Sequence, residues 1–150
     1  DLGPLPEHAG FVAAAAAACT EAAERRRAGA FAADTDLALD AVVTAVAGDA
    51  IEPSDELVAA LRRLATEWQS THDAWAAIDP ADAPVPAEWQ GTLTYAEQRA
   101  GLLTARADAV ESGDAAAIAG AFALNASPGP GIGDLAALGL ATRDCRALRA

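Results

Sequence analysis

A seam of small and apolar side chains runs through one continuous stretch of the chain. Its members alternate spacings of four and three residues without a miss: Trp89, Leu93, Ala96, Ala100, Leu103, Ala107 and Val110. This heptad spacing is typical of helices that pack lengthwise in antiparallel bundles. It predicts a helix over residues 88–112 that is closed by Gly113. Asp114 then predicts the N-cap of a further helix, in which Ile118 and Phe122 form the core face.

Apolar residues at helical spacing predict three more long helices, over residues 7–28, 36–47 and 54–78. The stripe of the first comprises His8, Val12, Ala15, Cys19, Ala22 and Arg26. The apolar face of the second comprises Leu39, Val42, Val43 and Val46. The stripe of the third comprises Leu57, Leu61, Leu64, Trp68, His72 and Trp75. A short last turn is predicted over residues 134–140.

Prolines and glycines divide these helices. Three prolines predict an extended connector over residues 79–86, and the Pro-Gly run at residues 127–131 predicts a break in the last helix. Residues 1–6 predict a flexible N-terminal segment. Because the chain contains no methionine, we expect Asp1 to follow a removed leader or a trimmed end. No stretch alternates with period two, so we expect an all-α single domain over residues 7–150: an antiparallel bundle of four main helices with short extra helices.

Alanine occupies 44 of the 150 positions, whereas Leu, Ile, Val and Phe together occupy only 29. So few large apolar side chains, in a chain of net charge −12, are typical of disordered proteins. Alanine, however, has the highest intrinsic helix propensity, and nearly all the large apolar residues fall on predicted helix faces. We therefore expect closely packed helices with alanine between them.

The charge of the chain restricts its partners. A net charge of −12 disfavours nucleic acid and anionic membrane surfaces, which would repel the protein. Seven acidic residues and no basic residue lie between Arg27 and Arg62, which indicates either a solvated acidic surface or a docking surface for a cationic partner. No apolar run is long enough to span a bilayer, although a lipid anchor upstream of Asp1 is compatible with the sequence.

The two cysteines lie near opposite ends of the chain. A bond between Cys19 and Cys145 would close almost the whole sequence into a loop, which the loop-entropy model values at about 5 kcal/mol. Two buried free thiols are the alternative. Neither cysteine has a neighbouring His or Cys, which disfavours a metal site. The sequence favours a structural disulfide in an oxidising compartment.

Four short motifs occur in an order that suggests a family. They are Ala17-Ala18-Cys19-Thr20-Glu21-Ala22, the helix Leu61 to Trp75 followed by Pro84, Pro86 and Trp89, Gly113-Asp114-Ala115-Ala116, and Leu138-Gly139-Leu140 before Cys145. With them the chain resembles the small secreted or lipid-anchored alanine-rich α-helical proteins of actinobacteria. The resemblance implies an exported helical bundle with a Cys19–Cys145 disulfide and no assigned activity. The Pro-Gly run at residues 127–131 departs from that pattern.

Residue patterns of known catalytic chemistry are missing from the sequence. No serine lies in a Gly-x-Ser-x-Gly elbow, and no Glu-x-x-His pair suggests a di-iron site. The glycines at 129, 131 and 133 lack the preceding strand and the following Lys-Ser/Thr of a phosphate loop. We therefore expect no catalytic residues, no cofactor and no metal, and hence no enzyme.

Two functions remain open from the sequence. The first is an exported, extracytoplasmic and non-catalytic bundle that is envelope-associated or binds an unknown protein. The second is a carrier of a small apolar ligand or haem, with a pocket near Trp68, His72, Trp75 and Trp89. Alternatively, the indoles only fill space that the alanines leave open. A cavity larger than about 300 Å³ beside the tryptophans would favour the carrier.

Overall fold

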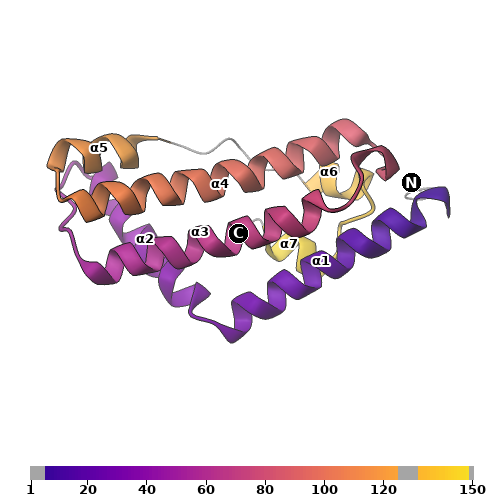
Figure 1. Ribbon diagram of the computed structural model, residues 1–150, viewed down its shortest axis with the longest axis horizontal. Helices are drawn as coiled ribbons and strands as arrows, with labels where there is room; N and C mark the ends of the chain where they lie inside the picture. The colour runs from indigo at the N-terminus through magenta and orange to yellow at the C-terminus, as the bar shows by residue number, and fades with distance from the viewer. Residues whose placement is uncertain (1–5, 125–131, 149–150) are drawn as a thin grey trace.

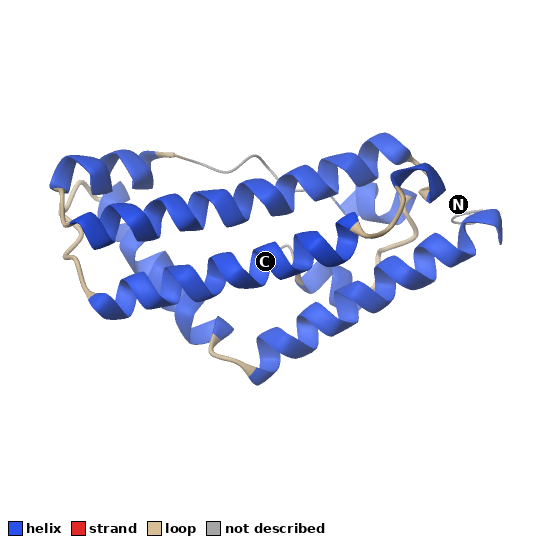
Figure 2. Cartoon of the chain, in the orientation of Figure 1, coloured by secondary structure: helices blue, strands red, loops and turns tan. Residues whose placement is uncertain are grey.

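The computed structural model describes residues 6–124 and 132–148, and every regular element in those two ranges is a helix (Figure 2). The predicted all-α class is therefore confirmed for this part of the chain. The flexible segment predicted over residues 1–6 lies outside the described residues except for Pro6, as does the break predicted at residues 127–131. In chain order the elements are η1 (Pro6–His8), α1 (Ala9–Ala28), α2 (Phe31–Val46), α3 (Asp55–Ala76), η2 (Pro80–Asp82), α4 (Pro86–Ser112), α5 (Ala115–Ala123), α6 (Ile132–Ala137) and α7 (Arg143–Ala147).

The centre of the fold is the antiparallel pair α3 and α4, which lie side by side along the long axis of the molecule (Figure 1). The heptad seam explains this pairing, because all of its members from Trp89 to Val110 are buried. Two of its alanines, Ala96 and Ala107, have no solvent exposure. The small side chains at these positions allow the helices to approach closely, as the sequence predicted.

The other helices cover different parts of the central pair. α1 and α2 meet at a corner near Gly29, and both pack on α3, while α5 folds back along α4 (Figure 1). On α1 the buried positions include Ala15, Cys19, Ala22 and Arg26, as the predicted stripe requires, and Phe11 joins them. His8 and Val12 are only partly buried.

The orientation of α2 differs from the prediction. Of its predicted apolar face only Val42 packs against the core, whereas the other three residues point outward and rank among the most exposed large apolar side chains in the described ranges: Leu39, Val43 and Val46. The reason lies on the opposite side of the helix. There Asp34 and Ala41, two turns apart, are both buried against neighbouring elements, and this contact turns the valines away.

The ends of the helices show which boundary signals the sequence carries. Ser54 caps α3 by accepting a hydrogen bond from the Leu57 backbone N–H, and Asp114 caps α5 as predicted. Gly113 ends α4 with a φ of 69°, a left-handed conformation that favours glycine. In contrast, α2 begins at Phe31, five residues before the predicted start at 36. No side chain caps its N-terminus, so the sequence carries no capping signal there.

The C-terminal segment is fixed to the first helix by a covalent bond. Cys19 on α1 and Cys145 on α7 form a disulfide, which confirms the predicted bond and excludes the alternative of two free thiols. α7 packs on α1, and Thr20 donates a hydrogen bond of 3.0 Å to the carboxylate of Asp144. The chain is thereby closed on itself over 126 positions.

Candidate functional site

The aromatic side chains of α1, α3 and α4 form one cluster in the core. Trp89 on α4 lies edge-on to Phe11 at 4.9 Å between ring centroids and to Trp75 at 5.8 Å. Trp68 lies edge-on to Tyr95 at 5.6 Å. The structure thus brings together the three tryptophans that the sequence singled out. The indole N–H groups of Trp75 and Trp89 are buried without an acceptor among the described residues, so ring packing holds these two indoles.

The C-terminal segment covers this cluster. A cavity of about 10 Å³ remains between the aromatic rings and the segment. Its lining comprises Cys19, Trp68, Trp75, Trp89, Thr92, Tyr95, Leu135, Leu140, Cys145 and Leu148. A space of this size holds about one water molecule. It is far below the roughly 300 Å³ of a typical ligand pocket. The closed structure therefore has no room for haem or for a small apolar ligand beside the tryptophans.

His72 does not join the tryptophan cluster. Its side chain lies at the edge of α3, about one-fifth exposed, and it does not line the cavity. Its Nδ1 lies 3.1 Å from the carboxylate of the neighbouring Asp73. The hydrogen bond from His72 lowers the pKa of Asp73 below its usual value, and a second one from Gln69 adds to this effect. His72 is therefore bound to a surface carboxylate and does not face a ligand space.

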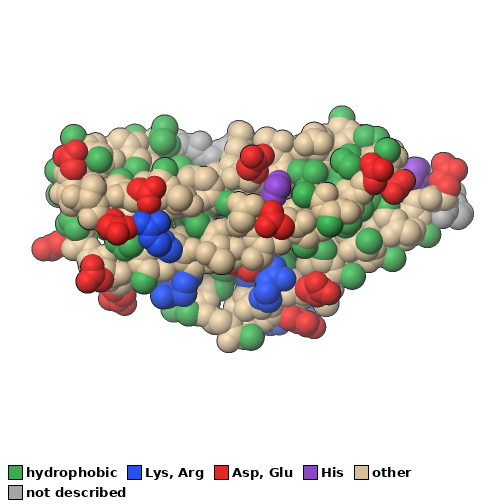
Figure 3. All heavy atoms as spheres, viewed as in Figure 1, with side chains coloured by type: hydrophobic (Ala, Val, Ile, Leu, Met, Phe, Trp, Pro, Cys, Tyr) green, Lys and Arg blue, Asp and Glu red, His purple; other side chains and the backbone are tan. Residues whose placement is uncertain are grey.

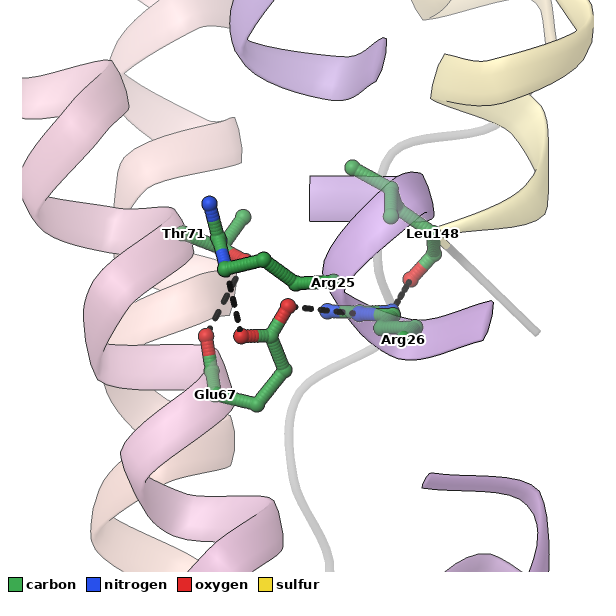
Figure 4. Close-up of polar contacts among 5 residues, drawn as sticks. All are labelled: Arg25, Arg26, Glu67, Thr71 and Leu148. Atoms are coloured by element: carbon green, nitrogen blue, oxygen red, sulfur yellow. Dashed lines mark hydrogen bonds and ion pairs between the residues drawn. The ribbon is translucent and has the colours of Figure 1, made fainter. Parts of the chain in front are cut away.

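A buried arginine joins three parts of the chain (Figure 4). The guanidinium of Arg26 donates from Nε to Glu67 at 3.3 Å and from Nη1 to the carbonyl of Leu148 at 3.4 Å. Arg25 donates to the other oxygen of Glu67 at 3.1 Å. Arg26 also lies 4.5 Å from the ring centroids of both Phe31 and Trp68. Burial lowers the pKa of Arg26, and the charge of Glu67 opposes this shift.

Arg25, Arg26 and Arg27 lie in the last turn of α1, where positive charge complements the helix dipole, but this accounts for only part of the role of Arg26. Arg26 is 8% exposed and belongs to the core, although it ends a helix. The signal was present, since Arg26 continues the spacing of the apolar stripe on α1. Its partners could not be predicted, because Glu67 and Leu148 lie 41 and 122 positions away.

A second buried arginine binds the C-terminal end of α5. Arg106 on α4 donates to the backbone carbonyls of Ala121 at 3.5 Å and Leu124 at 3.0 Å, and its guanidinium lies 4.9 Å from the ring centroid of Phe122. Burial lowers the pKa of Arg106, and the nearby charge of Arg99 lowers it further. Positive charge at these carbonyls complements the dipole of α5. Arg106 therefore has a structural task.

The outward face of α2 is the most unusual part of the described surface. Leu39, Val43 and Val46 are 56%, 59% and 82% exposed. The opposite side of the helix is held by Asp34, which accepts hydrogen bonds of 2.8 Å from both Nε and Nη2 of Arg63 on α3. These hydrogen bonds raise the pKa of Arg63. α2 is thus fixed in an orientation that leaves large apolar side chains in water.

An open groove lies at the C-terminal end of the same helix. It has a volume of about 410 Å³ and lies between the end of α2, the following loop and α5. Val46 and Asp49 line one side, and Ile118, Ala119 and Phe122 line the other. The sequence did not predict this groove, because it depends on how α5 returns along α4 and comes to lie beside α2.

Acidic side chains dominate the surface. On the face seen in Figure 3 they are spread over the whole molecule, while the arginines are few and lie close to acidic neighbours. Arg62, for example, pairs with both Asp108 and Glu111 on α4. Within residues 6–124 and 132–148, no group of His, Cys, Asp and Glu is arranged to hold a metal ion. In the same ranges no helix is both long and apolar enough to cross a membrane.

Comparison with known proteins gives no relative. No family model, no curated protein and no solved structure matches this chain. Within the described residues, the exposed apolar face of α2 contrasts with the nearly filled space around the tryptophans.

Proposed function

We propose that this protein is an exported, non-catalytic helical protein that acts by binding a partner protein through its surface. The observation that carries the proposal is the outward face of α2. A chain with so few large apolar residues places three of them in water on one side of one helix, where they add nothing to the core and form an apolar surface that a partner can cover. The filled space around the tryptophans supports a function at the surface and not in the interior.

We expect the four main helices of this protein to form an antiparallel bundle. The antiparallel pair α3 and α4 supports this arrangement. Export is supported by the disulfide, because such bonds persist in oxidising compartments and are rare in reducing ones. The absence of catalysis is supported by the histidines. His8 contacts Glu7 and the carbonyl of Asp82, and His72 contacts Asp73, so neither is hydrogen-bonded to a nucleophile among the residues that the structure describes.

Site-specific photo-crosslinking in the native cells tests partner binding. A photoreactive residue is placed at Val43 on α2, Glu21 on α1 or Gln98 on α4, which are all exposed. We expect a discrete crosslinked protein from at least one of these three surfaces. If none of them yields a crosslinked protein, the partner-binding function is wrong.

Two further measurements test the remaining parts of the proposal. Thiol trapping in intact cells should find Cys19 and Cys145 protected as a disulfide, whereas alkylation of both without prior reduction would contradict export. Native mass spectrometry of the purified chain should show the protein mass alone. A stoichiometric apolar ligand or haem would instead support a carrier.

A further inference from the structure

We infer, resting on the partner-binding function proposed above, that the outward face of α2 and the adjoining groove bind a cationic amphipathic helix of a partner protein. α2 is apolar on two opposite sides. One side packs on the core through Leu37, Ala38 and Ala41, and the other presents Leu39, Val43 and Val46 at spacings of four and three. The apolar face of a helix in a globular protein normally packs against another element. Here one side remains uncovered.

The shape of the surface fits a helix. The three exposed side chains form a ridge over about two turns in the C-terminal half of α2, which corresponds to about 10 Å. The ridge ends at Val46, which also lines the groove of about 410 Å³ beside α5. The apolar side chains of Ile118 and Phe122 are buried at the groove wall. A partner helix laid along the ridge could place an apolar side chain in this groove, which is a common mode of helix recognition.

The charges around the ridge determine which kind of helix fits. Asp36 and Asp40 lie along one edge of the ridge, one turn apart, and Asp49 lies at the groove. None of these three carboxylates forms an ion pair among the described residues, whereas Asp34 on the same helix is paired with Arg63. No basic residue occurs between Arg27 and Arg62 in the sequence, so α2 and the loop after it carry no positive charge of their own. The complementary surface is therefore apolar in its centre and carries Lys or Arg beside it.

The same charges argue against two other occupants. Pairing with a second copy through α2 would bring the same three unpaired aspartates together without a base between them, which like-charge repulsion opposes. Contact with an anionic membrane is opposed by the same carboxylates and by the net charge of −12. A cationic amphipathic helix of another protein would cover the apolar ridge and would also pair with the free carboxylates.

A synthetic peptide tests the inference directly. The probe is a labelled amphipathic helix of about 16 residues, matching α2, with Leu on one face and Lys on the other. Two control peptides have Glu in place of Lys, or the same composition in scrambled order. Fluorescence anisotropy with the full, oxidised chain should show binding of the Lys peptide only. Raising the salt from about 0.05 M to about 0.5 M should weaken this binding, because exposed charges are screened.

Variants of the protein locate the binding surface. Val43→Gln with Val46→Gln removes apolar surface without changing charge and should weaken binding by about tenfold or more. Asp36→Asn, Asp40→Asn and Asp49→Asn together should weaken binding by about three- to tenfold and flatten its salt dependence. The matched control is Glu21→Gln, Glu24→Gln and Glu97→Gln, which should change binding less than about twofold. It removes three exposed charges on α1 and α4 that form no ion pair within the described part of the chain.

Several outcomes would overturn the inference. Equal loss in the control triple would mean that the peptide responds only to net charge, and tight binding of the scrambled peptide would have the same meaning. A dimer in sedimentation that the Val43 and Val46 substitutions abolish would assign the face to a second copy. Binding to phosphatidylglycerol vesicles that depends on these valines would assign it to a membrane. If the peptide fails but Glu21 or Gln98 yields a crosslinked protein, only this inference fails. If no surface yields one, the partner-binding function fails as well.

Discussion

Arg26 is the charged side chain on which the most distant parts of the chain converge. It extends from the last turn of α1, lies between the rings of Phe31 on α2 and Trp68 on α3, and binds Glu67 and the carbonyl of Leu148. Burying a guanidinium is costly, and the carboxylate and carbonyl compensate for that cost only while all of them stay in place. Arg26 therefore makes the positions of α1, α3 and the C-terminal segment depend on one another.

Substitution of Arg26 should destabilise the protein strongly. We expect Arg26→Ala to lower the free energy of unfolding by about 2–4 kcal/mol, because it removes the pairing with Glu67 and leaves a gap between two aromatic rings. Arg27→Ala is the control on the neighbouring position, since Arg27 is 60% exposed and reaches Asp144 only at 3.9 Å. It should change stability by less than about 0.5 kcal/mol. Urea unfolding measures both, and equal losses would show that Arg26 has no special role.

Residue patterns allowed prediction of positions but not of partners. On the stripe of α1, Cys19 and Arg26 are buried as predicted, whereas His8 and Val12 are only partly buried. The three tryptophans lie together around one small cavity. The spacing on α3 predicts that His72 lies beside the tryptophans, but a side chain at the margin of a stripe can turn to the surface, where Asp73 binds it. The spacing along one helix does not determine whether such a side chain faces the core or the solvent, because this depends on which neighbouring element packs against the helix.

At the level of whole elements, prediction worked best where one pattern persisted. The prediction for α4 is confirmed at every position of the seam. Its seven residues extend over about six turns, and only one face of a helix contains all of them. The face of α2 was wrong because a shorter helix with apolar residues on two sides offers two choices. The ion pair between Asp34 and Arg63, 29 positions apart, favours the side that the sequence did not indicate.

The close approach of the central helices should make α4 intolerant of larger side chains. Ala107 has no solvent exposure in the seam, whereas Ala105 on the same helix is exposed. We expect Ala107→Leu to cost about 1–3 kcal/mol, because the added atoms must push neighbouring elements away. Ala105→Leu should stay within about 0.5 kcal/mol. Thermal melting followed by circular dichroism compares the two, and an Ala107→Leu variant as stable as the wild type would contradict the close packing.

For the whole molecule, the disulfide compensates for the scarcity of large apolar residues. It joins positions 126 apart, and in the loop-entropy model it contributes about 5 kcal/mol by restricting the unfolded chain. We expect the reduced protein, and the variant with Cys19→Ala and Cys145→Ala, to melt well below the oxidised wild type. Identical midpoints with and without reductant would show that the helical core is sufficient alone.

The same bond sets an order of events during synthesis. Cys19 leaves the ribosome before its partner, which follows only after another 126 residues, or about ten seconds of elongation. The α3–α4 hairpin, whose halves are close in sequence, can form within that interval. The thiol of Cys19 therefore has to remain unreacted while most of the protein folds beside it. Any premature mixed disulfide at this position would keep the last helix from reaching its place, so the yield of correctly closed chains depends on how well the early thiol is protected.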